Sequence, residues 1–119
     1  GNAVTIDSAG KIVVAGFTSW VGFSPDFAVV RYNTDGSLDT SFSGDGKQST
    51  DFGLDWDIAY AVAIQDDGKI VMAGYATTGN QNWALARYQT NGNLDSSFGS
   101  NGRVVTDFNA TGEYARGVA

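Results

Sequence analysis

The stretch Asp67-Gly68-Lys69-Ile70-Val71-Met72-Ala73-Gly74 has an earlier copy in this chain, Ala9-Gly10-Lys11-Ile12-Val13-Val14-Ala15-Gly16. Each copy is a turn that leads directly into an apolar run rich in β-branched residues. This pattern predicts a hairpin turn followed by a β-strand. The two copies are 58 residues apart.

The surroundings do repeat. Residues 26–52 and 82–108 are identical at 13 of 27 positions when they are aligned at an offset of 56. We therefore divide the chain into a first repeat (1–57), a second repeat (58–113) and the start of the next repeat's first strand (114–119). The first copy has two additional residues between Gly16 and Asp26.

Each repeat carries four strand signals, and none of its windows has the three-and-four spacing of a helix. In the second repeat the strands are expected at 58–64, 69–76, 83–88 and 103–108. The first of them alternates between larger side chains and alanine, from Ile58 to Ile64. Neither of its faces is polar, so both must be covered. Two four-stranded antiparallel repeats of about 56–58 residues predict an all-β fold built from β-propeller blades.

Composition and charge exclude several function classes. The chain has 119 residues, of which 42% are hydrophobic and 17% charged, as expected for one globular domain. A net charge of −6 argues against nucleic acid as a partner, and no apolar run approaches the ~18 residues of a membrane span. Cysteine and histidine are both absent, which removes disulfides, thiolate metal sites and histidine-based nucleophile activation.

The combined motifs resemble one known family. These are Asp-Gly-Lys-Ile-Val-Met-Ala-Gly, then Phe/Trp-Ala-x-x-Arg-Tyr, then Gly-x-Leu-Asp-x-Ser-Phe, and finally Thr-Asp-Phe. In both copies, and over nearly the whole chain, they look like the delta-60 repeat β-propellers of large bacterial surface and secreted proteins. The resemblance implies a propeller fold and an extracellular or cell-surface location. It implies no catalytic residues.

Two blades do not close a propeller ring of four to eight. We expect the ring or stack to be completed by other copies of the chain or by further repeats, because the flat alanine faces and open strand edges would otherwise promote aggregation. This leads to our main expectation, a non-catalytic structural or recognition module. A subunit that only assembles rings or filaments is one alternative.

A second alternative is a lectin-like site. The loops between the second and third strands and between consecutive repeats lie at the same end of the blades, and they carry aromatic and acidic residues. Rings beside polar groups suit a sugar. The candidate ligand-binding residues are Trp20, Phe23, Asp55, Trp56, Asp57 and Trp83. The competing interpretation is that Trp56 and Trp83 only fill gaps between neighbouring blades.

The pattern Asn33-Thr34-Asp35-Gly36-Ser37-Leu38-Asp39 has the oxygen spacing of part of a calcium loop. The cation Arg31 stands where such a loop should open, and the second copy has fewer carboxylates. We therefore favour a turn held by side-chain hydrogen bonds, and we expect no metal or cofactor.

Two arginine–aspartate pairs recur at the same spacing in both copies, Arg31 with Asp39 and Arg87 with Asp95. We predict a partly buried ion pair within each blade, holding down the loop between its third and fourth strands. Because both copies have the pair, we assign it a structural role.

An enzyme is the remaining alternative. Glycosidases need only two carboxylates, and Asp55 with Asp57 would supply them. Neighbouring loop aspartates on an acidic surface are usually solvated, so we expect no enzymatic activity.

Overall fold

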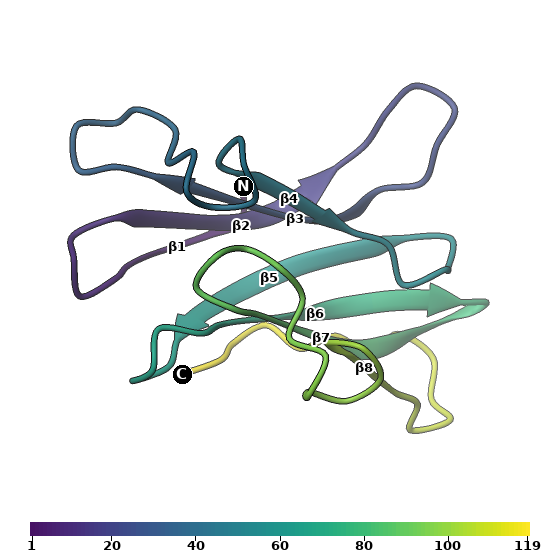
Figure 1. Ribbon diagram of the computed structural model, residues 1–119. Helices are drawn as coiled ribbons and strands as arrows, with labels where there is room; N and C mark the ends of the chain where they lie inside the picture. The colour runs from purple at the N-terminus through teal and green to yellow at the C-terminus, as the bar shows by residue number, and fades with distance from the viewer.

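Two four-stranded antiparallel sheets form the molecule (Figure 1). The computed structural model describes residues 1–119, apart from the side chain of Thr78. The first sheet contains β1 (Ala3–Ile6), β2 (Ile12–Thr18), β3 (Asp26–Tyr32) and β4 (Lys47–Thr50), and the second contains β5 (Asp57–Ile64), β6 (Ile70–Thr78), β7 (Asn80–Tyr88) and β8 (Arg103–Thr106). In each sheet the strands lie side by side in chain order. The predicted all-β fold is confirmed.

The described backbone contains no helix, and accordingly none that is long and apolar enough to cross a membrane.

The two repeats differ at the connection between their second and third strands. β6 and β7 are both longer than predicted, and Gly79 alone joins them with a φ of 84°, a conformation that favours glycine. In the first repeat, residues 19–25 separate β2 from β3. The first repeat therefore projects a loop at a place where the second repeat has only a tight hairpin.

β5 is buried on both faces, as its sequence predicts, with Ala59 and Val62 both in the core. Its strict alternation is broken at one point, however, because the pairing with β6 shifts register between Ala59 and Ala61. Gly74 lies opposite Ala59, and a Cβ atom placed on it would lie 1.9 Å from the carbonyl oxygen of Ile58. Only glycine fits this close approach.

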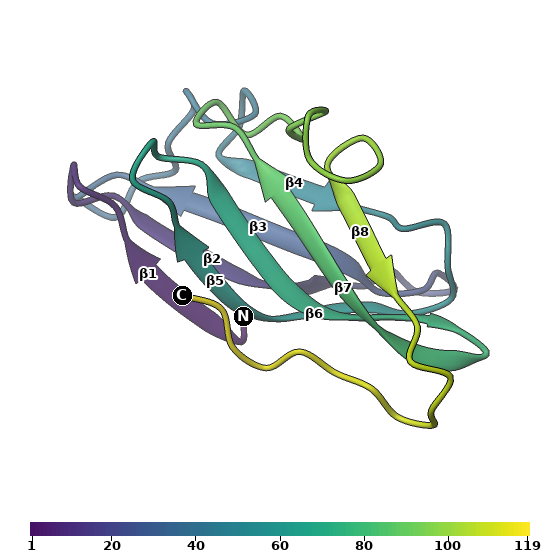
Figure 2. The same cartoon turned by 90° about the horizontal axis from the view of Figure 1, so that it is seen from below.

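The core lies between the two sheets, which pack face to face as two layers (Figure 1). Figure 2 shows β5 to β8 side by side in front of the first sheet. Small alanine side chains on the second sheet allow the larger residues of the first sheet to approach closely. The first sheet contributes Val13, Ala15, Phe27 and Val29, and the second contributes Val62, Met72, Ala84 and Ala86.

Hydrogen bonds also join the two sheets. The hydroxyl groups of Tyr88 and Thr50 are 2.7 Å apart and buried, and burial raises the pKa of Tyr88 to about 12. The Arg31 guanidinium donates to the carbonyl oxygen of Thr90 at 2.8 Å. These contacts fix the register of one blade on the other.

The first predicted ion pair is present in the first blade. Nε of Arg31 donates to Oδ2 of Asp39 at 2.6 Å, and the two residues are only 7% and 4% exposed. Nζ of Lys11 lies 2.7 Å from the same oxygen, while Oδ1 accepts hydrogen bonds from Ser41. These contacts with Lys11, Ser41 and Arg31 hold the pKa of Asp39 well below its usual range.

The second blade has the equivalent pair. Nε of Arg87 donates to Oδ2 of Asp95 at 2.8 Å, with Lys69 at 3.0 Å. The Arg87 side chain is 19% exposed, against 9% for Arg31, because no further blade covers it. Hydrogen bonds from Ser97 and the nearby Lys69 lower the pKa of Asp95. The contacts are those predicted, and their contribution to stability stays a prediction.

Residues 114–119 contain no strand, but they follow the second sheet much as β5 follows the first. The backbone N–H of Glu113 donates to the carbonyl oxygen of Gln81, as Asp57 donates to Pro25 one repeat earlier. The ring of Tyr114 packs on Tyr75. The backbone N–H of Ala115 donates to the carbonyl oxygen of Gly74 in β6 at 3.2 Å, so the segment lies along the second sheet without forming a strand.

We predict that Asp39→Ala lowers the melting temperature by about 10 °C at pH 7, because it leaves a buried guanidinium without its partner. Asp95→Ala should have a smaller effect, since Arg87 reaches solvent more easily. The difference between wild type and Asp39→Ala should shrink as the pH falls below about 4, because a carboxylate with a lowered pKa stabilises the fold only while it is ionised. Circular dichroism melts at several pH values measure both effects.

The matched control is Asp35→Ala, which removes an exposed carboxylate from the same loop. If Asp39→Ala melted at the same temperature as Asp35→Ala, the ion pair would not be holding the loop.

Candidate functional site

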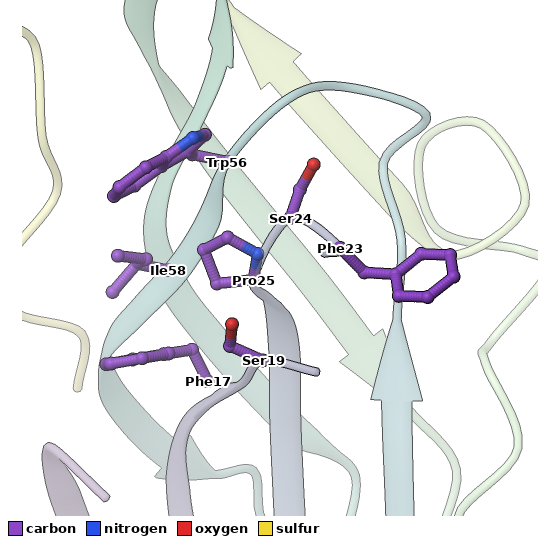
Figure 3. A pocket seen from close by; sticks show the side chains of 7 residues that line it. All are labelled: Phe17, Ser19, Phe23, Ser24, Pro25, Trp56 and Ile58. Carbon is purple, nitrogen blue, oxygen red and sulfur yellow. The ribbon is translucent and has the colours of Figure 1, made fainter. Parts of the chain in front are cut away.

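An aromatic cavity opens between the two sheets at the end where β4 leads into β5. Its volume is about 430 Å³, and its lining residues are Phe17, Ser19, Phe23, Ser24, Pro25, Trp56 and Ile58. In Figure 3 the side chains of Phe17, Ile58 and Trp56 line up along one side of the cavity, and the Phe23 ring points away from them. Trp56 and Phe17 are 56% and 46% exposed, so their rings are accessible from solvent.

Two segments build this cavity. The loop 19–25 supplies both serines and Pro25, and the link between the sheets supplies Trp56. The second repeat has neither feature, since Gly79 replaces the loop and Gly112 stands at the position of Trp56. The cavity is therefore an addition to the first repeat and is not required by the blade architecture.

Two of the six predicted ligand-binding residues, Phe23 and Trp56, line this cavity, and the Phe23 ring points away from Trp56. Trp20 instead lines a second cavity of about 550 Å³, over the outer face of the first sheet beside Ala28 and Val30. Sequence reasoning did not select Phe17 and Ile58, because they lie on strands and reach the cavity only when the sheets pack.

Trp83 lies apart from the cavity. Its ring packs against Phe108 at 5.1 Å between centroids, and the equivalent rings of the first repeat, Phe27 and Phe52, are 4.9 Å apart. Phe27 is fully buried between the sheets, whereas Trp83 is 45% exposed on the outer face of the second sheet. This equivalence supports the interpretation of Trp83 as a residue that fills the space between blades.

The two predicted carboxylates, Asp55 and Asp57, also lie in different environments. Asp55 is exposed, and its backbone N–H donates to Thr77. Asp57 is 0% exposed, and its Oδ2 accepts a hydrogen bond from the backbone N–H of Phe52 at 2.8 Å. Because Asp57 is buried and Asp55 is exposed, the two carboxylates do not line one open site as a glycosidase pair would.

Asp57 belongs instead to a carboxylate cluster that the sequence did not reveal. Asp26 at the start of β3 and Asp51 after β4 each place a carboxylate oxygen near one of Asp57, with all three oxygens within 4.8 Å of one another. They come from segments up to 31 residues apart. The pairing of β3 with β4 places Asp26 next to Asp51, and the packing of β5 on the first sheet adds Asp57. Oxygens this close can all contact a single cation.

Burial and mutual repulsion disfavour the ionised form of the carboxylates in this cluster. Burial, together with the neighbouring Asp51 and Asp26, raises the pKa of Asp57 to about 6. Burial and the charge of Asp51 also raise the pKa of Asp26. Arg103, whose Nη1 donates to the carbonyl oxygen of Asp51 at 2.5 Å, provides an opposing positive charge.

The segment with the calcium-like spacing forms a hydrogen-bonded turn. Asp35 Oδ1 accepts bonds from the backbone and hydroxyl of Ser37, which lower its pKa, and Asn33 donates to the same hydroxyl. Asp39 is engaged by Arg31 and Lys11.

We predict that Asp57→Asn raises the melting temperature by about 4 °C at pH 7 in metal-free buffer. The amide keeps an acceptor for the Phe52 N–H and removes a buried negative charge from the cluster. Asp57→Ala should lower the melting temperature, because that N–H then loses its acceptor. Asp55→Asn is the control at an exposed neighbour. A fall in melting temperature for Asp57→Asn would contradict this account of the cluster.

The chain was compared with known proteins. A family model described as "Domain of unknown function (DUF5122) beta-propeller" matches residues 10–42 and 65–98. A search of curated proteins finds no match. The two matched segments start at equivalent turns of the two repeats and together cover more than half of the 119 residues. The chain therefore belongs to this β-propeller family.

Proposed function

We propose that the chain is a non-catalytic scaffold and recognition module, a pair of propeller blades whose outer faces are completed by further blades. The blades would come from other copies of the chain or from further repeats of the same protein. One observation carries this proposal. In each pair of equivalent residues from the two repeats, the residue between the sheets is buried and the residue on an outer face is exposed.

The outer face of the first sheet supplies the first comparison. Val4 is 65% exposed, and its equivalent Val62 is 9% exposed because the first sheet covers it. Ile6 is also 65% exposed, while Ile64 packs against the core. The first sheet thus presents the same apolar face that the second sheet buries.

The outer face of the second sheet supplies the converse comparison. Trp83 and Phe108 are 45% and 57% exposed, whereas their equivalent Phe27 is fully buried and Phe52 packs against the core. The outer face of one sheet is therefore complementary to the outer face of the other, because the equivalent inner faces already pack against each other. A contact of this kind between different faces is heterologous, and it propagates into rings or stacks.

The resemblance of the motifs to delta-60 repeat propellers supports the biological setting that we propose, a bacterial surface or secreted protein. A net charge of −6 is consistent with protein or glycan partners and unsuited to nucleic acid.

We predict that the chain self-associates in a concentration-dependent way and that Val4→Glu weakens this association at least tenfold. A charge on the outer face opposes burial there, but it leaves the monomer fold unchanged because Val4 is already exposed. Native mass spectrometry and light scattering at protein concentrations between about 1 and 100 µM would measure the self-association. Thr40→Glu, on an exposed loop, introduces the same charge as a control.

A monomer at every concentration would rule out completion by separate copies. A tandem fusion of two chains would then test completion by further repeats, since an added blade interface should raise the melting temperature and sharpen unfolding. If the fusion melted like the single chain, the scaffold function would be wrong.

A second function is favoured by the aromatic cavity, which we propose binds a carbohydrate. The exposed rings of Trp56 and Phe17 suit the apolar face of a sugar, and the hydroxyl groups of Ser19 and Ser24 suit its polar groups. Its restriction to the first repeat also favours a binding role over a purely structural one.

We predict a saturable change in tryptophan fluorescence when neutral oligosaccharides are titrated into the protein, with millimolar affinity. Trp56→Ala should lose at least 90% of this response, because the ring would form the sugar-stacking surface. Trp83→Phe, which restores the residue type of the first repeat, should keep it. Equal responses in wild type and Trp56→Ala, or no saturation with any sugar tested, would contradict the carbohydrate site.

A further inference from the structure

The carboxylate cluster has the dimensions of a cation site. Asp26, Asp51 and Asp57 come from three different segments, and their nearest oxygens lie within 4.8 Å of one another. Calcium binds oxygens at 2.3–2.6 Å, so two of its ligands are separated by at most about 5 Å. Magnesium, with bonds of 2.0–2.1 Å, would require all of these oxygens within about 4.2 Å. Separations of up to 4.8 Å are within the range that calcium spans.

A second observation points to a ligand. Asp57 is fully buried, and its Oδ1 has no hydrogen-bond partner among the described residues, although its Oδ2 accepts from Phe52. Buried carboxylate oxygens without a partner are rare in folded proteins. The buried oxygen belongs to the carboxylate that Asp26 and Asp51 approach, so a cation bound by this oxygen would supply the missing partner.

The charges around the cluster leave room for a divalent cation. Three carboxylates carry three negative charges when they are ionised, and the Arg103 guanidinium, bonded to the Asp51 carbonyl, offsets one of them. Two negative charges remain, which one divalent cation balances. Oxygen-only ligands are those that hard cations such as calcium prefer.

The second repeat provides an internal comparison. At an offset of 56, the residues equivalent to Asp26, Asp51 and Asp57 are Asn82, Asp107 and Glu113. The longer Glu113 side chain satisfies both of its oxygens locally, since they accept hydrogen bonds from the N–H groups of Phe108 and Ala110. Asp57 and Glu113 therefore both accept backbone hydrogen bonds from the segment that precedes them. Only Asp57 has a carboxylate oxygen without a hydrogen bond and two further carboxylates beside it.

We propose that Asp26, Asp51 and Asp57 form a calcium-binding site that ties the end of the first sheet to the start of β5. The remaining ligands are waters, because Asp51 is exposed on the solvent side. The bound ion fixes the link between the two blades. This site does not depend on whether the outer faces assemble or whether the cavity binds a sugar.

The test is calcium binding by the 119-residue chain after treatment with a chelator. Calcium chloride at 10 mM should raise the melting temperature by at least about 3 °C, as expected for a site of sub-millimolar affinity. Terbium, which replaces calcium, should show luminescence sensitised by the adjacent Trp56, and calcium should displace it. Asp26→Asn should weaken the affinity for calcium and for terbium at least tenfold, as measured by the melting-temperature shift and by the luminescence. This variant installs the residue of the second repeat and is expected to fold.

Asp107→Asn is the matched control, because it removes the equivalent of Asp51 from the second repeat. It should bind calcium like the wild type. Three results would each overturn the site: no shift with wild type, equal responses in wild type and Asp26→Asn, or a magnesium response as strong as that of calcium. The second would indicate weak binding to the acidic surface as a whole.

Discussion

The close packing of one sheet on the other is the interaction on which the rest of the structure depends. Phe27 and Val29 of the first sheet lie against a surface of the second in which Ala84 and Ala86 leave the space they need. This packing places β5 against the first sheet and buries Asp57 at the junction. It also forms the cavity beside Trp56.

The same packing explains why equivalent residues have different environments in the two repeats. Phe27 and Trp83 occupy the same position in the blade, but only Phe27 has a neighbouring sheet to cover it. A repeat protein of this kind stabilises each unit mainly through its neighbours, so an outer face resembles an interface without its partner. The contrast between the two faces therefore supports the proposed addition of further blades.

The candidate binding features lie where the two repeats differ from each other. The seven-residue loop 19–25 and Trp56 have no counterparts in the second repeat, where Gly79 and Gly112 stand. Asp26 and Asp57 are likewise replaced by Asn82 and Glu113. Residues that both repeats share, such as Arg31 and Arg87, form ion pairs within their blades, whereas the loop 19–25 and Trp56 of the proposed carbohydrate site occur only in the first repeat.

Strand order, the presence of two repeats in this chain and the arginine–aspartate contacts follow from the sequence, because they depend on local periodicity and on motifs that occur twice. The sequence also indicates which end of the blades carries the aromatic residues. It does not determine that Trp56 and Phe17 share a cavity while Trp83 lies elsewhere, or that Asp57 meets Asp26 and Asp51. Those contacts join segments distant in the chain, and only the stacking of one sheet on the other sets their distances.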